Sequence, residues 1–229
     1  MLQNAADQLP RFATYYNAVF LLNALLTTFL LTAAGCLFGL IVGFWAAVLR
    51  RTRGWILAPL RGVAIAVIEL FRRIPFLVTL LIVFYAFQMA AVEVSVFTVA
   101  VVSVCLIATA YISEIVRAGL DSVHPNQWDS AAVNNFSLLQ TLRWVVIPQA
   151  WKVILPPSFS FFLLFVKDSA LASQIGVVEL TYAGKILNNK GFSPILSFGA
   201  ILILYFVLSY PLALAGKRME NRLARPAHR

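Results

Sequence analysis

Lys167 and Asp168 are neighbouring ionisable residues inside a long apolar run of this sequence. A lysine could bind the carboxylate of a zwitterionic solute and an aspartate its ammonium group, or the two could serve a proton or ion relay. Because adjacent residues of a helix point about 100° apart, they cannot pair with each other. Each therefore needs another partner, a cavity or a substrate, and a structural bridge to Glu114 or to a neighbouring subunit is an equal alternative.

Further polar residues extend this candidate translocation path. Asp168 is its best candidate, because a lysine can extend towards a lipid headgroup and an aspartate cannot. Glu114 lies at the end of another apolar run, where it could also simply pair with Arg117 three residues later. The candidate path residues are Lys167, Asp168, Ser169, Ser173 and Glu114.

Motifs for catalysis are missing from the sequence. Gly184-Lys185 and Gly216-Lys217 lack the upstream glycine and the following Ser or Thr of a Walker A motif. The two histidines are far apart, and neither a zinc-protease helix motif nor a nucleophile elbow is present. We therefore predict no catalytic residue, metal or cofactor on this chain, so that an ATPase, if transport is powered, is a separate polypeptide.

The composition indicates a polytopic membrane protein. Of the 229 residues, 61% are hydrophobic and only 12% are charged. Several apolar runs reach the roughly 20 residues that a helix needs to cross a bilayer. The net charge of +9 could indicate nucleic-acid binding. The basic residues cluster at the ends of apolar runs, however, as in membrane loops that face the cytoplasm, and we expect no nucleic-acid partner.

We predict an all-α fold with one transmembrane domain over residues 1–229. Fourteen of the 18 Lys and Arg residues then lie on the cytoplasmic side, which predicts an external N-terminus and a cytoplasmic C-terminus. Gly35, Gly39 and Gly43 lie four residues apart in the first span and predict a face that another helix approaches closely. The five predicted spans are residues 19–49, 76–92, 94–115, 153–178 and 194–216, with an outer loop at residues 179–193 between the last two.

A polar stretch between Asp121 and Gln149 is expected to form two short helices. Asn126 is expected to cap the first helix, with Asp129 near its positive end. Trp128, Ala131 and Ala132 are spaced to share one face of that helix.

The end of this first helix and the start of the second also have sequence signals. Asn135 is expected to end the first helix in the left-handed conformation. Ser137 and Gln140 form a capping box for the second helix, which Pro148 is expected to end.

A second motif precedes the span at residues 76–92. Arginines at the membrane midplane are strongly unfavourable. We therefore place Arg61, Glu69 and Arg72 on a helix at the cytoplasmic surface. Pro75 then starts the span, at a position that tolerates a missing amide. Glu69, Arg72 and Pro75 are the named residues of this pre-span motif.

Both motifs resemble those of ABC importer permeases of the polar amino-acid branch. Gln127-Trp128 and Ile147-Pro148-Gln149-Ala150 align with their cytoplasmic EAA loop without a gap. Inside that loop the chain departs from the family pattern, with an acid, a small residue and a turn-competent residue in place of Glu, Ala and Gly: Asp129, Ser130 and Asn135. Residues 69–77 are similar to the E-x-F-R-x-x-P-L-L segment of the same branch.

The resemblance implies a MetI-like permease fold in the bacterial cytoplasmic (inner) membrane, and import of a polar amino acid by alternating access. It also implies a second permease subunit, two ABC ATPases that bind ATP and magnesium, and an extracytoplasmic solute-binding protein. The coupling loop would be residues 117–150. Its implied ATPase contacts are Gln127, Trp128, Asp129, Ser130, Ala131, Ala132, Asn135 and Ser137.

Three alternatives stay open on the sequence. The first is a secondary transporter in which Lys167 and Asp168 form an ion relay, and co-purification of an ATPase would exclude it. The second is a non-transporting membrane scaffold, suggested by the altered loop motif, and substrate uptake would exclude it. The third concerns only the helix around Trp128, which could pack on the chain's own spans.

Overall fold

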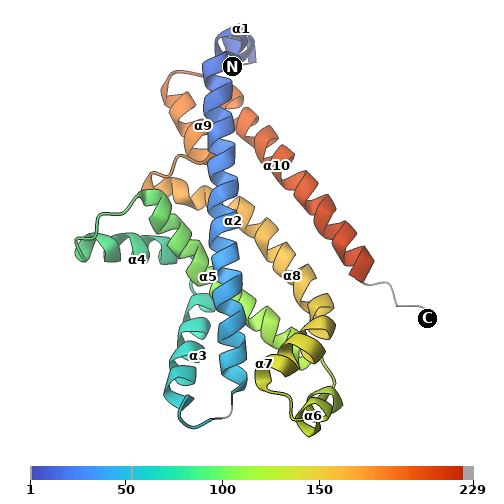
Figure 1. Ribbon diagram of the computed structural model, residues 1–229. Helices are drawn as coiled ribbons and strands as arrows, with labels where there is room; N and C mark the ends of the chain where they lie inside the picture. Colours follow the sequence, from blue (N-terminus) through green and yellow to red (C-terminus); the bar gives the residue numbers. More distant parts are fainter. Residues whose placement is uncertain (1, 53, 224–229) are drawn as a thin grey trace. The chain divides into compact units, whose positions relative to one another are not determined.

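The structure is a computed structural model that describes residues 2–52 and 54–223. Every regular element in these ranges is a helix (Figure 1), as the sequence predicts. In chain order the elements are α1 (Leu2–Phe12), α2 (Tyr15–Arg51), α3 (Ala58–Arg73), α4 (Phe76–Met89), α5 (Val96–Asp121), α6 (Pro125–Val133), α7 (Leu138–Thr141), the π-helical turn η1 (Leu142–Val146), α8 (Ile147–Asp168), the 3-10 helix η2 (Ser169–Ile175), α9 (Leu180–Asn189) and α10 (Pro194–Leu223).

Within the described residues, four helical segments are long and apolar enough to cross a membrane, namely α2, α5, the continuous stretch Leu138–Ile175 and α10. They correspond to four of the five predicted spans. The fifth, α4, has only 14 residues. At the helical rise per residue it is about 21 Å long, less than the roughly 30 Å of the hydrocarbon core. The predicted span 76–92 is therefore too long, because the chain turns at Ala91, which has a positive φ of 52°.

Two helices were not predicted. α1 lies in the N-terminal residues, and α9 lies within the stretch 179–193 that was expected to be an outer loop. The residue that caps α9 is Glu179, whose carboxylate accepts hydrogen bonds from the first amides of the helix. Glutamate is not among the residues that commonly cap helices, so the sequence carries no start signal there.

One compact unit consists of Met1–Leu37, Ile74–Cys105 and Phe162–Leu214. In its core, α9 packs against α2 and α10. Gly184 lets α10 come close to α9, because a Cβ atom at this position would lie 2.8 Å from Ile201. The buried residues of this core are Leu21, Ala24, Leu180, Ala183, Leu187 and Ile201.

The second compact unit consists of Phe38–Arg73, Leu106–Phe161 and Ala215–Arg229. It contains the C-terminal part of α2, the helix α3, the C-terminal part of α5 and the whole α6–η1 region. The predicted coupling loop belongs to this unit, and so does the pre-span motif except for Pro75. The candidate coupling site therefore lies in this unit.

The predicted glycine face of α2 packs on α5. A Cβ atom at Gly35 would lie 2.5 Å from Val104, and one at Gly43 would lie 2.9 Å from the carbonyl oxygen of Thr109. At Gly39 it would overlap the Cβ atom of Ala108. The three glycines therefore let the two helices approach to a distance that no larger residue permits, which confirms the prediction.

We predict that Gly39→Ala destabilises the protein by about 1–3 kcal/mol, since the added methyl group must push α5 away. Gly199→Ala on α10 is the matched control, because no atom lies within 4 Å of the added Cβ there. Alanine also favours a helix over glycine, so the control should keep or raise the melting temperature. Thermal unfolding of the two purified variants measures the difference, and equal melting temperatures would contradict a tight α2–α5 contact.

Candidate functional site

The helix α6 begins at Pro125, with His124 as its cap. Nδ1 of His124 accepts a hydrogen bond from the backbone N–H of Asn126 at 3.2 Å. The prediction that Asn126 caps the helix is therefore wrong by two positions. Pro125 explains the earlier start, because a proline at the first helical position has a suitable fixed φ and lacks only an amide that the helix would leave unpaired.

The end of α6 and the start of α7 follow the predicted pattern. Asn135 has a positive φ of 57°, and the next amide, that of Phe136, donates to the carbonyl oxygen of Ala131 at 3.0 Å. Ser137 and Gln140 form the predicted capping box, with a 2.8 Å hydrogen bond from the Ser137 amide to Gln140 Oε1. These local bonds give the loop a defined shape of its own.

The prediction that Pro148 ends the second helix is wrong. The single turn α7 continues through the π-helical turn η1 into α8, and Pro148 is the second residue of α8. A proline inside a continuous helix removes one backbone hydrogen bond, and the wider π-helical turn η1 lies just before Pro148, where that bond is missing. Pro156 and Pro157 also lie inside α8, which they do not break.

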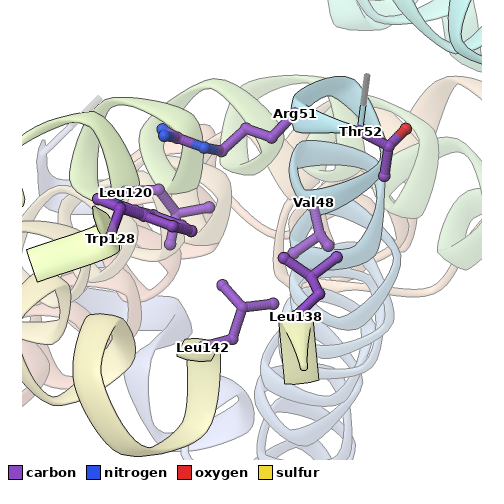
Figure 2. A pocket seen from close by; sticks show the side chains of 7 residues that line it. All are labelled: Val48, Arg51, Thr52, Leu120, Trp128, Leu138 and Leu142. Carbon is purple, nitrogen blue, oxygen red and sulfur yellow. The ribbon is translucent and has the colours of Figure 1, made fainter. Parts of the chain in front are cut away.

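Trp128 and Ala131 point from α6 into the chain's own second unit. Ala131 is buried, and Trp128 lines a pocket of about 320 Å³ together with residues of α2, α5 and α7–η1 (Figure 2). The guanidinium of Arg51 lies 4.2 Å from the centre of the Trp128 ring, a cation–π contact. The residues that line this pocket are Val48, Arg51, Thr52, Leu120, Trp128, Leu138 and Leu142.

The outer surface of α6 carries mostly small and polar side chains, together with the exposed Val133 at its C-terminal end. Trp128, Ala131 and Ala132 share one side of α6 by their spacing, as predicted, but Ala132 lies at its edge and is exposed. Gln127 also accepts a hydrogen bond from Nε2 of Gln149 at 3.2 Å, which connects α6 to α8. Together with Ala132, the predicted ATPase contact residues that are exposed on the loop are Gln127, Asp129, Ser130, Asn135 and Ser137.

Glu114 is the centre of a cluster of arginines. Its carboxylate lies 3.1 Å from Arg50 and 3.5 Å from Arg72. It also accepts hydrogen bonds from Arg117, one of them 3.0 Å long from Nε, so the predicted pair on one helix is confirmed. Three helices, α2, α3 and α5, therefore meet at one carboxylate.

The pre-span motif joins this cluster. Glu69 and Arg72 lie in the last turns of α3, where Glu69 binds both Arg72 at 3.3 Å and Arg73 at 3.1 Å. The hydroxyl of Tyr111 donates to the carbonyl oxygen of Arg72 at 3.2 Å. Pro75 is the N-cap residue of α4. The structure thus brings Glu69, Arg72 and Glu114 together, although they were assigned to two different sites from the sequence.

The remaining candidate path residues lie along α8 and η2. Lys167 is exposed and Asp168 is half-buried, and neither side chain forms an ion pair with the other. Ser169 is buried, and its hydroxyl donates to the carbonyl oxygen of Val166 at 2.8 Å. Ser173 is also buried and accepts a hydrogen bond from Lys185 Nζ at 3.1 Å. Lys185 was missed in the sequence because it lies in the stretch expected to be an outer loop.

Glu179 is a second polar residue that sequence reasoning missed. Its side chain is fully buried. It accepts hydrogen bonds from the amides of Thr181 and Tyr182 at 2.9 and 2.8 Å, and from the hydroxyl of Tyr205 at 2.9 Å. Burial raises the pKa of the Glu179 carboxyl above its ordinary value, although these donors act in the opposite direction.

This raised pKa predicts a pH-dependent difference between the wild type and Glu179→Gln. Below the ordinary pKa of 4.5 the carboxyl is protonated in both the folded and the unfolded states. As the pH rises above that value the unfolded state ionises first, so the wild type loses stability relative to Glu179→Gln until the folded pKa is passed. Thermal unfolding of both proteins across this pH range measures the effect, and a constant difference would contradict it.

The family of binding-protein-dependent transport system inner membrane components matches residues 39–225, which include both motifs described above. The chain belongs to this family. The predicted ABC permease resemblance and the location in the inner membrane are thereby confirmed, and the chain is a component of a transport system.

Curated relatives extend over most of the chain. The probable glutamine ABC transporter permease protein GlnP of Bacillus subtilis (strain 168) is 30% identical over 200 residues, which are 85% of this chain and 91% of the relative. The glutamine transport system permease protein GlnP of Escherichia coli (strain K12) is 30% identical over 86% of this chain and 89% of its own. The L-cystine transport system permease protein TcyB of B. subtilis (strain 168) is 33% identical over 85% of this chain and 82% of its own.

Solved structures of transporters share the fold. A crystal structure of an amino acid ABC transporter with histidines superposes with a TM-score of 0.80 at 28% identity, over 90% of this chain and 94% of that chain. An inward-facing structure of the MetNI methionine ABC transporter gives a TM-score of 0.77 at 21% identity, over 93% of this chain and 100% of that chain. The predicted MetI-like permease fold is confirmed.

Proposed function

We propose that this chain is the permease subunit of an ATP-driven importer of a polar amino acid. The observation that carries the proposal is its similarity, over at least 85% of its length, to permeases named for glutamine and cystine. The structure supports it with a loop suited to receive a partner, since α6 is seated by Trp128 and Ala131 and keeps its polar side outside.

The proposed assembly contains a second permease subunit, two ABC ATPases that bind ATP and magnesium, and an extracytoplasmic solute-binding protein. In this assembly the N-terminus is external, and the loop α6–η1 and the C-terminus face the cytoplasm, in agreement with the distribution of Lys and Arg residues. Hydrolysis takes place on the ATPases and the chain itself needs no cofactor.

The exposed side of α6 is the proposed ATPase contact. Gln127, Asp129, Ser130 and Ala132 would lie in a groove of the ATPase, as a short helix presented to a partner. Trp128 and Ala131 hold α6 on the permease, whereas Asn135 and Ser137 fix the turn that follows. ATP-driven closure of the two ATPases would move this loop and rock the spans between inward-open and outward-open states.

We predict that Ala132→Glu prevents the ATPase from binding, because a larger, charged side chain replaces a methyl group on the exposed side of α6. Ala90→Glu is the matched control, since Ala90 is also exposed but lies at the end of α4. The complex would be purified, reconstituted and assayed for ATP-dependent uptake of labelled glutamine and cystine. The expected result is at least about a tenfold loss of uptake and of co-purified ATPase for Ala132→Glu only. Uptake of an amino acid without ATP would instead support a secondary transporter.

We further propose that Asp168 faces the translocation path or its wall. A half-buried carboxylate in the middle of an apolar segment is strongly unfavourable in contact with lipid. Asp168→Asn keeps the size and hydrogen-bonding capacity of the side chain and removes its charge. We expect uptake to fall at least about tenfold while the complex assembles and binds the ATPase.

Asp7→Asn removes the same charge from α1 and is the control for this test. Normal transport by Asp168→Asn would show that the charge is not used on the substrate. Failure of the complex to assemble would instead identify Asp168 as a buried structural partner.

A further inference from the structure

We propose that a continuous series of charged contacts from Arg51 to Arg72 transmits movement of α6 to the end of α3, where the pre-span motif lies. The inference deepens the proposed function and rests on it. Neither motif alone suggests such a connection, because the loop and the pre-span segment are far apart in the sequence. Every contact of the series lies within the second compact unit. The series consists of Arg51, Asp121, Arg117, Glu114 and Arg72, and begins at Trp128 of α6.

The first step connects α6 to the ends of α2 and α5. Arg51, the last residue of α2, places its guanidinium over the Trp128 ring (Figure 2). The same guanidinium forms an ion pair with Asp121, the last residue of α5. A displacement of α6 moves Trp128 and therefore also the Arg51 guanidinium that lies over its ring. Asp121, which is paired with that guanidinium, is then displaced as well.

The middle steps run along one face of α5. Asp121 binds Arg117 at 2.7 Å, and Arg117 binds Glu114. These three residues are spaced by three and four positions, so their side chains lie in one row on the helix. Glu114 also binds Arg50 of α2, which keeps the row attached to both helices.

The last step reaches the segment before α4. Glu114 binds Arg72, which is one residue from the end of α3. The carbonyl oxygen of Arg72 also accepts a hydrogen bond from the hydroxyl of Tyr111 on α5 at 3.2 Å. Movement of the row on α5 is therefore passed on to the end of α3.

Glu114, in the middle of the series, is its least exposed charge and is also attached to α2. Only 22% of the Glu114 side chain and 13% of the Arg50 side chain that binds it are exposed, whereas the other four members of the series are 32–46% exposed. Separating such a pair would leave an uncompensated, poorly solvated charge, which is strongly unfavourable. Paired groups therefore move together. A pocket of about 360 Å³ borders the row and gives the arginine side chains room to shift, with Arg50, Arg51, Ile65, Arg117 and Asp121 as its lining.

The experiment compares Arg51→Gln, Arg72→Gln and the double variant in the reconstituted complex. The quantity measured is the number of ATP molecules hydrolysed per labelled glutamine or cystine imported, since this ratio does not depend on how much complex is folded. We expect each single variant to raise the ratio at least about fivefold, the lower end of typical couplings between sites. The double variant should resemble the stronger single variant, because a series that is broken once cannot be broken further.

Arg73→Gln is the matched control, because it removes the same charge from the neighbouring residue, and Arg73 forms its ion pair with Glu69, outside the series. It should keep the wild-type ratio. An unchanged ratio in Arg51→Gln and Arg72→Gln, or two effects that multiply in the double variant, would overturn the series and leave the proposed function intact. A wild-type complex that imports neither amino acid with ATP would overturn both.

Asp121→Asn provides a second break that does not endanger folding, because 46% of the Asp121 side chain is exposed. It interrupts the series in the middle, so its ratio should rise as in the two end variants. If Arg72→Gln fails to assemble, this variant decides the question alone, and a wild-type ratio for Asp121→Asn would then contradict the proposal.

Discussion

The close contact between α2 and α5 is the constraint on which the second unit depends. Gly39 and Gly43 remove the side chains that would otherwise separate these helices. The contact continues towards the C-terminal ends of both helices, where Arg50 lies 3.1 Å from Glu114. A wider separation would leave the carboxylate of Glu114 without its partner on α2, in surroundings that solvate a charge poorly. Helix packing and ion pairing therefore support each other: the glycines bring the charges within reach, and the charges hold the helix ends together.

The features that sequence predicted well are those determined by neighbouring residues. The left-handed Asn135 and the capping box of Ser137 and Gln140 depend on bonds within a few positions, and both were found. The glycine face of α2 depends on a spacing of four, which a helix converts into one surface. The failures within the same loop also have local causes. Pro125 occupies the first position of α6 and so moves its start forward, and the π-helical turn before Pro148 lets the helix continue through that proline.

The features that sequence could not supply depend on distant partners. Arg50 and Glu114 are 64 positions apart, and nothing in their local patterns indicates that they pair. Glu179 provides a second example, since its burial depends on Tyr205 and on the packing of α9 against other helices. The same reasoning explains why Asp168 could be identified as unusual but not assigned a partner. Its apolar neighbours in the sequence show that the carboxylate needs a polar partner, but they do not indicate which residue that partner is.

The π-helical turn η1 has a consequence for how the loop is oriented. A π-turn contains one residue more than an α-helix would use for the same hydrogen-bonded segment, because its turn is wider and takes up the extra residue. In a regular α-helix one more residue would instead rotate everything before it by about 100° around the helix axis. η1 lies between α7 and α8, both of which belong to the second unit in this region. The angular position of α6 and α7 relative to α8 thus depends on the π-turn. A regular α-helical path through the same residues would point the loop in a different direction, with every cap preserved.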